Sequence, residues 1–217
     1  MHEYVAVDGL TGVHTIQKGN LRSTAFYLAD DSVCVVSPIA GLPAEAYTPL
    51  GAEKQIKHAL APNHFHHKGL DDFVQAFPKA KIYAPEAAID RLRGQNDLSY
   101  NALNKLAKLL PKDTAIVATE GLKTGEVWVR FKQAKTTAWL VIDAFCGPKA
   151  TAANKTASKP ELLKPFPAYG VGDKEKYCAW AKQQIKQDKP RLLLPCHGSL
   201  VKSSTLPKEL TNLVDTL

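Results

Sequence analysis

Hydrophobic positions along the chain follow two patterns. Short apolar runs rich in β-branched residues and bounded by turn residues predict strands, whereas apolar residues three and four positions apart predict helices. The strand-like runs are AFYLA and VCVV within 23–39, IKHALAP at 56–62, KAKIYAP at 79–85, TAIVAT at 114–119, GEVWVRF at 125–131, TTAWLVIDAF at 136–145 and PRLLLP at 190–195.

Helical spacing marks a second set of segments. A helix over 86–93 is favoured further by Pro85 before it and Gly94 after it. The other predicted helices are 70–77, 98–110, 173–187 and 205–217, with a short helix or turn at 42–51. The order of strands, helices, strands, helix, strand and helix is typical of an α/β protein with helices packed outside its sheets.

Composition narrows the class of protein. The 217 residues suffice for one well-buried domain, and 45% hydrophobic with 23% charged residues is ordinary for a globular chain. No apolar run reaches the roughly 18 residues that a membrane-spanning helix needs. The first residues lack the pattern of a signal peptide, and the four cysteines form no C-x-x-C pair. We therefore expect a single domain over 1–217, cytoplasmic, with no membrane partner and no disulfide framework.

The net charge of +7 admits nucleic acid as a partner. The lysines are spread along the chain, however, and no arginine-rich stripe or stacking-aromatic motif is present. The sequence therefore argues against nucleic acid, and a small anionic substrate or plain solubility explains the charge equally well.

Polar groups follow three of the predicted strands. The cluster His64, His66 and His67 comes after the run at 56–62, Asp143 follows the run at 136–142, and His197 follows the run at 190–195. Loops at strand ends converge on sites in sheet proteins. Imidazoles and a carboxylate at such positions are suitable ligands for zinc, manganese or iron.

The segment PNHFHHKGLDDF at 62–73 resembles the metallo-β-lactamase superfamily signature H-x-H-x-D-H-x-G-G when aligned on Gly69. Later segments keep the order of that superfamily. GLKTGEVWV resembles its G-H-T-x-G turn, WLVIDAF its aspartate after a strand, and LLLPCHGSLV its final G-H-G-like turn. The chain is most similar to a branch with A-P-N-x-x-H-H in place of the signature. The resemblance covers roughly 20–201 and implies an αββα sandwich.

The resemblance also implies which half of the superfamily's two-metal site is kept. Of the three ligands of one metal, only His64 remains, because Pro62 and Leu122 stand where that superfamily has histidine. The ligand positions of the other metal are all filled by competent groups, namely His66, His67, Asp143 and His197. The resemblance therefore implies at most one tightly bound divalent metal, with zinc favoured and manganese or iron as alternatives.

The function that this implies is metal-dependent hydrolysis of a small-molecule substrate, with Asp143 or His64 as general base or orienting group. The alternative is a catalytically degenerate binding or scaffold protein, which Leu122 and Pro62 favour. Each candidate residue also has an ordinary structural role open to it, such as a turn or a buried hydrogen bond. If the loop at 147–165 borders the site, its four lysines would favour an anionic substrate: Lys149, Lys155, Lys159 and Lys164.

Overall fold

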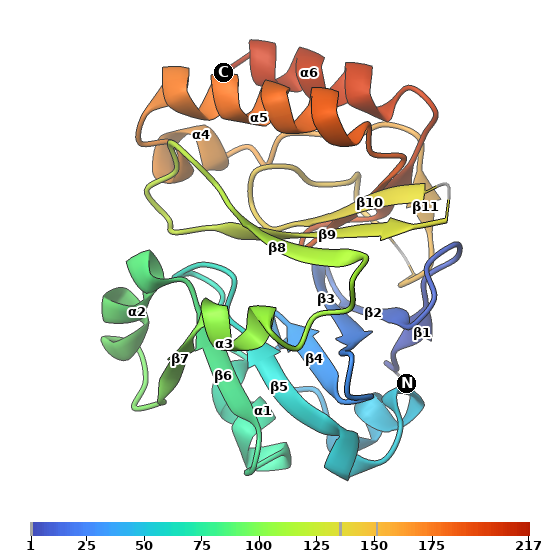
Figure 1. Ribbon diagram of the computed structural model, residues 1–217, viewed down its shortest axis with the longest axis vertical. Helices are drawn as coiled ribbons and strands as arrows, with labels where there is room; N and C mark the ends of the chain where they lie inside the picture. Colours follow the sequence, from blue (N-terminus) through green and yellow to red (C-terminus); the bar gives the residue numbers. More distant parts are fainter. Residues whose placement is uncertain (1, 135, 151) are drawn as a thin grey trace.

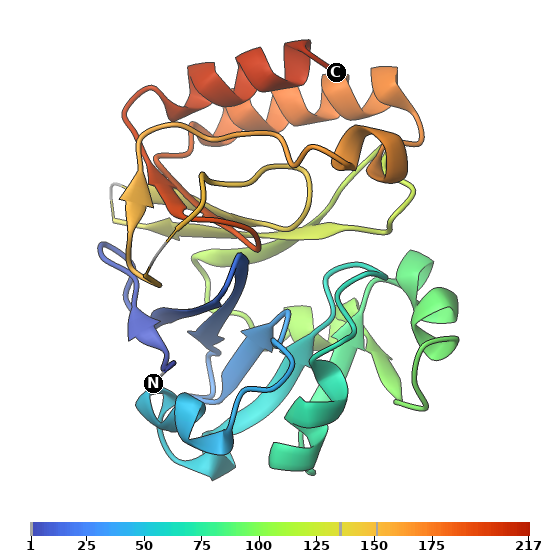
Figure 2. The ribbon, with the colours of Figure 1, turned by 180° about the vertical axis from the view of Figure 1, so that it is seen from behind.

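A computed structural model describes residues 2–134, 136–150 and 152–217. In these residues two β-sheets lie face to face (Figures 1 and 2). The first sheet has the strand order β1 (Val5–Ala6), β2 (Val13–Lys18), β3 (Leu21–Tyr27), β4 (Val33–Val36), β5 (Ile56–Leu60), β6 (Lys81–Ala84), β7 (Tyr100–Ala102). The second has the order β11 (Thr156–Ala157), β13 (Leu200–Lys202), β12 (Leu192–Pro195), β10 (Thr136–Val141), β9 (Val127–Gln133), β8 (Thr114–Ala118).

Helices cover the outer face of each sheet (Figure 1). With the first sheet lie η1 (Ala44–Leu50), η2 (Glu53–Gln55), α1 (Leu70–Ala76) and α2 (Glu86–Arg93). The short α3 (Leu103–Ala107) differs, because its Leu103 and Leu106 pack in the layer between the two sheets. With the second lie α4 (Phe166–Gly170), α5 (Lys174–Asp188) and α6 (Leu206–Asp215). Among the described residues, no helix is long and apolar enough to cross a membrane.

Alternation along the strands places the core in three apolar layers. In β4, Val33 and Val35 pack toward the helices of the first sheet, while Cys34 faces the other sheet. In β10, Leu140 faces the first sheet and Trp139 packs against α5 and α6. Because successive side chains of a strand point to opposite faces, strands with no polar face are buried on both sides. The layers are therefore helix, sheet, sheet and helix, as expected from the sequence.

The segment 98–110 differs from its predicted helix. Tyr100–Ala102 forms the strand β7, which pairs in parallel with β6, and only Leu103–Ala107 is helical. Hydrogen bonds to the open edge of β6 outweigh the helical spacing here, because a short helix is only marginally stable by itself. The hairpin of β1 and β2 was also absent from the prediction, since its turn at 9–12 separates runs of mixed polarity.

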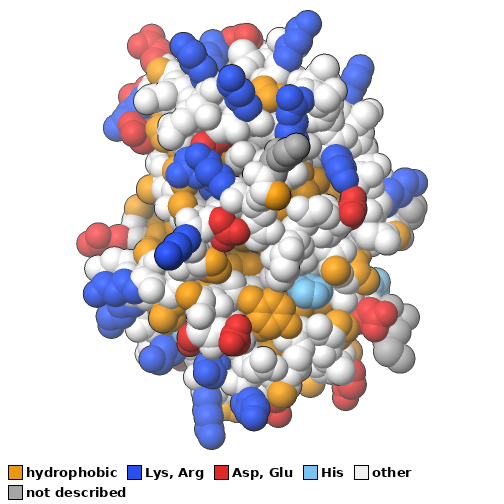
Figure 3. Space-filling model, turned by 45° about the vertical axis from the view of Figure 1, so that its right-hand side comes forward, with side chains coloured by type: hydrophobic (Ala, Val, Ile, Leu, Met, Phe, Trp, Pro, Cys, Tyr) orange, Lys and Arg blue, Asp and Glu red, His pale blue; other side chains and the backbone are white. Residues whose placement is uncertain are grey.

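Basic side chains are spread over the surface. Figure 3 shows them around the end of the molecule that carries α5 and α6 and again at the opposite end, with hydrophobic side chains between. Acidic side chains are interspersed with them. The positive charge of the chain is therefore not gathered into one stripe on this face.

One buried carboxylate holds α5 to the second sheet. Asp188 accepts hydrogen bonds from Arg130 Nη1 at 3.0 Å and from Trp139 Nε1 at 3.1 Å, and its Oδ1 lies 3.1 Å from Lys132 Nζ. An Asp188→Ala variant leaves these donors without their acceptor. We expect its free energy of unfolding to fall by about 2–4 kcal/mol, measured by urea denaturation.

The matched control is Asp215→Ala. Asp215 pairs with Lys182 at an exposed position, where the two side chains are 52% and 45% accessible. Exposed pairs contribute less than about 1 kcal/mol. Equal losses in the two variants would contradict the assigned role of Asp188.

Candidate metal centre

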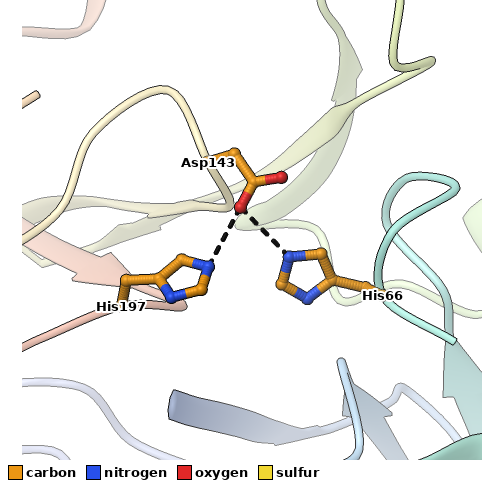
Figure 4. A group of neighbouring side chains, drawn as sticks. All are labelled: His66, Asp143 and His197. Atoms are coloured by element: carbon orange, nitrogen blue, oxygen red, sulfur yellow. Dashed lines mark hydrogen bonds and ion pairs between the residues drawn. The ribbon is translucent and has the colours of Figure 1, made fainter. Parts of the chain in front are cut away.

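Three loops at strand ends bring His66, Asp143 and His197 together (Figure 4). The Oδ1 atom of Asp143 lies 3.2 Å from His66 Nε2 and 3.0 Å from His197 Nε2. One potential ligand atom of each residue lies within 4.8 Å of the others. Three of the predicted site residues therefore converge, and both imidazoles aim the same nitrogen at one carboxylate oxygen.

Strand register explains the pairing of Asp143 with His197. β10 and β12 are parallel neighbours in which Val141 lies opposite Pro195. Asp143 and His197 each come two residues after that pair. Neighbouring strands are about 4.8 Å apart, so the register alone brings the two side chains to one edge. His66 arrives from the loop after β5, in the other sheet.

Asp143 is held from behind by Asn63 and Glu126. Asn63 Nδ2 donates to Asp143 Oδ2 at 2.8 Å, which turns Oδ1 toward the imidazoles. Asp143 is buried, and burial by itself would raise its pKa. Hydrogen bonds with His197 and His66 outweigh burial and hold the pKa of Asp143 well below its usual range. The carboxylate is therefore ionised throughout the physiological range.

Glu126 was missed by the sequence analysis. Its carboxyl group is fully buried and accepts hydrogen bonds from Trp128 Nε1 at 2.7 Å and from the Asp143 backbone N–H at 3.2 Å. Burial, followed by the charge of Asp143, raises the pKa of Glu126 to about 8. The available signal was the position of Glu126 at the start of the apolar strand EVWV. A buried acid is rare without a partner, so an acid at this position suggests a hydrogen-bonded role in the interior.

Ser37 orients the ring of His66. Ser37 Oγ lies 2.5 Å from His66 Nδ1, on the side of the ring opposite Asp143. In a neutral ring whose Nδ1–H donates to Ser37, Nε2 carries a lone pair, which can bind an electrophile in place of the contact with Asp143. A partner of this kind on the second ring nitrogen is usual for metal-binding histidines. Ser37 adopts a left-handed backbone conformation with φ of 53°, which residues other than glycine seldom adopt.

His67 does not join this group. Its ring nitrogens lie outside the 4.8 Å cluster, and burial, then the charge of Lys68, lowers its pKa. Consecutive residues of the turn point in different directions, and the His67 carbonyl accepts from the Leu70 N–H where α1 begins. Of the four predicted ligands, three therefore lie within 4.8 Å of one another in this structure.

His64 is also committed elsewhere. Its Nδ1 lies 2.9 Å from the Thr124 carbonyl oxygen, and Arg91 Nη1 donates to its Nε2 at 3.1 Å. Burial, then the charge of Arg91, lowers the pKa of His64. Both nitrogens of His64 therefore contact protein groups in this structure, and the general-base role that the sequence suggested remains a prediction.

Leu122, which stands at one of the positions expected for a second metal, lies in an apolar environment. Leu122 packs against the apolar layer under α5 and forms a β-bridge with Val171. Metal ions in proteins are bound mainly by His, Cys, Asp and Glu. Within 2–134, 136–150 and 152–217, His66, Asp143 and His197 form the one group of three or more of these residues whose ligand atoms lie within 4.8 Å of one another. The described residues therefore offer one candidate group of metal ligands.

The turn that carries His197 is clamped by the β2–β3 hairpin. Leu21 forms a β-bridge with His197, and the buried Arg22 donates from Nη2 to the Gly198 carbonyl at 3.0 Å. Gly198 has φ of +79°, and a Cβ atom there would lie 2.0 Å from the Gly147 carbonyl oxygen. Only glycine fits this turn.

A Gly198→Ala variant should therefore displace His197. We expect a loss of about 2–4 kcal/mol in the free energy of unfolding from strain and overlap. Metal content measured on the same sample should fall as well. Ala substitution at Gly9, which also has a positive φ but open space around its Cβ position, is the control for backbone strain alone. A wild-type metal content in Gly198→Ala would contradict the clamp.

A cleft of about 830 Å³ opens over the three residues. Its walls come from the β2–β3 turn, the residues after β4, the loop after β5 and the segment before α4. The segment 147–165 contributes Leu163 and Pro165, and its four lysines are not among the residues that line the cleft. The expected source of positive charge is therefore absent from the walls.

The fold is that of the metallo-β-lactamases. No model of a protein family matches the chain, and no curated protein matches it by sequence. Solved structures do match. The metallo-beta-lactamase from Pontibacter korlensis has a TM-score of 0.60 and 12% identity, with 100% of both chains covered.

Two longer proteins share the same fold. Rubredoxin oxygen:oxidoreductase from Desulfovibrio gigas has a TM-score of 0.66 and 11% identity over 98% of this chain and 62% of its own. The flavodiiron protein from Giardia intestinalis has a TM-score of 0.59 and 12% identity over 99% of this chain and 58% of its own. The likeness confirms the fold class expected from the sequence. At this identity it does not extend to function.

Proposed function

We propose that the chain is a metal-dependent hydrolase that holds one divalent ion, zinc in the first instance, between His66, Asp143 and His197. The observation that carries this proposal is the convergence of two imidazole Nε2 atoms on one carboxylate oxygen at the floor of a cleft. Three protein ligands with a position left for water are the usual composition of a catalytic zinc site.

Two of the three distances between ligand atoms fit such an ion. In a tetrahedral site with bonds of about 2.0–2.1 Å, neighbouring ligand atoms are about 3.3 Å apart. The two distances from Asp143 Oδ1 to the imidazoles are 3.2 and 3.0 Å. Both imidazoles must be neutral and offer Nε2, and the contact of Ser37 with Nδ1 is compatible with that tautomer of His66, because the hydroxyl can accept from Nδ1–H.

The bound ion would lower the pKa of a water molecule toward about 7 and polarise the bond to be cleaved. The other tasks fall to residues of the chain. Asn63 and Glu126 fix the direction of the Asp143 carboxylate. Tyr169 lines the cleft, and burial, then the charges of Asp143 and Glu126, raise the pKa of its hydroxyl. That hydroxyl therefore stays protonated as a hydrogen-bond donor at the floor of the cleft.

A catalytically degenerate binding protein is the second candidate. The contacts of Asp143 with His66 and His197 form a self-contained network of hydrogen bonds, which needs no ion to satisfy the buried carboxylate. The apolar surroundings of Leu122 and the contact of His64 with Thr124 support this candidate, because neither residue is offered to a second ion. In this reading the cleft is kept for binding alone.

Elemental analysis separates the two candidates. The protein is purified without a histidine tag, then measured as isolated and after dialysis with zinc or manganese. The hydrolase requires about one equivalent of metal per chain. Two equivalents would contradict the single position, and no metal even after loading would leave the binding protein.

A further inference from the structure

Two exposed hydrophobic side chains stand at the mouth of the cleft. Leu21 and Phe65 are each 45% exposed, and they are the exposed large hydrophobic residues of the described chain. Both line the cleft that holds His66, Asp143 and His197. Solvent-exposed apolar surface that is concentrated at one place marks a binding site. The feature calls for a ligand with an apolar part.

Both side chains are held in place. The ring of Phe65 packs edge-on against Tyr169 at 5.0 Å and lies 4.1 Å from the ring of His64. Leu21 sits at the β-bridge to His197. Each therefore belongs to a segment that also supplies or clamps a residue of the metal centre. A ligand lying on these two side chains has its reacting group above the three candidate ligands.

Further apolar wall comes from two other loops. Ile39 and Ala40 follow β4, and Leu163 and Pro165 precede α4. The cleft is therefore apolar on several sides, with volume for a molecule larger than a simple inorganic ion. Burying a hydrocarbon there yields about 25 cal/mol for each Å² of apolar surface removed from water.

Outside the metal centre, the charged side chains that line the cleft are all positive. Asp143 is the one carboxylate that lines it, against the cations Lys18, Arg22 and Lys68. Lys18 donates to the carbonyls of Ala40 and Gly41, and Arg22 donates to backbone and side-chain oxygens within the protein. Lys68 is exposed, next in the chain to His67. It is therefore the cation in the cleft that is placed to meet a ligand.

Resting on the proposed hydrolase, we infer that its substrate is an amphiphilic anion. The apolar body lies on Leu21 and Phe65, and a single negatively charged end pairs with Lys68. A small, highly charged compound such as a phosphate fits less well, because the four lysines of 147–165 do not line the cleft.

Calorimetric titration of the metal-free protein tests this inference without any catalytic step. The probes are hexanoate, octanoate and decanoate, with 1-octanol and inorganic phosphate for comparison. We expect affinity to rise about two- to fourfold for each added methylene group. Octanoate should bind more tightly than 1-octanol, and phosphate should not bind at the same concentrations. Affinity that does not change with chain length, or phosphate binding as tight as that of octanoate, would overturn the inference.

Variants assign the two ends of the probe. Phe65→Ser and Leu21→Ser should weaken octanoate at least about fivefold, because each removes exposed apolar surface from the cleft. Leu217→Ser, far along the chain and outside the cleft, is the matched control. Circular dichroism checks that each variant is folded. If both cleft variants bind octanoate as the control does, the apolar body does not lie on these side chains.

Lys68→Gln should weaken octanoate and leave 1-octanol unchanged, and Lys105→Gln on α3 is its control. An equal effect on both probes would remove the charged end from the inference. The results also distinguish failure of this inference from failure of the proposed function.

Amphiphile binding by a protein that takes up no metal would contradict the proposed hydrolase and support the assignment of the cleft. Metal uptake without amphiphile binding would do the reverse.

Discussion

A His197→Ala variant is expected to lose its tightly bound metal. The ion would keep only His66 and Asp143, and affinity for zinc should fall by more than about 100-fold, since loss of a direct ligand exceeds the 10–100-fold cost of losing an outer partner. Metal content measured by elemental analysis after dialysis should drop from about one equivalent to near zero. Folding should persist, because His197 lies at the cleft and not in an apolar layer.

His64→Ala is the informative control. His64 lies two positions before His66 in the same loop, but its ring nitrogens contact Thr124 and Arg91 and not the metal centre. It should therefore keep its metal, with a loss confined to stability. If His64→Ala emptied the site while His197→Ala left it filled, the ligand assignment would have to be abandoned.

A Glu126→Gln variant should change how stability depends on pH. The pKa of Glu126 is about 8 in the folded protein and about 4.5 in the unfolded chain. A raised pKa means that the folded state holds the proton more tightly. Its stabilising effect is fully present below pH 4.5 and is lost as pH rises toward 8. Glutamine does not titrate, so this loss is absent from the variant. Between pH 4.5 and 8, the free energy of unfolding of the variant should therefore rise relative to that of the wild type by about 1.4 kcal/mol per pH unit.

Urea denaturation of metal-free wild type and variant at pH 5, 6, 7 and 8 gives this difference directly. Glu120→Gln is the control, because Glu120 is exposed and pairs with Lys176 at the surface. Parallel stability curves for wild type and Glu126→Gln would show that Glu126 is ionised across the whole range. The raised pKa would then be wrong.

The sequence predicted those parts of the site that strand ends dictate. Asp143 and His197 follow short apolar runs, and strand ends together with the family resemblance were enough to expect them at one site. The parallel pairing of β10 with β12 that brings them together is known only from the structure. The same reasoning placed His66 and His67 together. It could not separate them, because the side-chain directions in a turn depend on its backbone and not on its composition.

The residues that form hydrogen bonds with the candidate ligands could not be predicted from the sequence. Ser37, Asn63 and Glu126 are single polar residues beside apolar runs, and nothing in their spacing marks them. They become partners only because β4, β5 and β9 come together in the fold, which no local pattern records. His64 shows the converse, since its place in the cluster suggested chemistry and tertiary contacts with Arg91 and Thr124 gave it a structural role.

The position of β12 has a consequence for biosynthesis. β12 lies inside the second sheet, between β13 and β10, yet it is among the last strands in the chain. His197 follows Asp143 by 54 residues. A chain still attached to the ribosome exposes His66 and Asp143 first, which are two of the three candidate ligands. If the chain binds an ion as proposed, the complete set of ligands is therefore present only after the final strands have been translated.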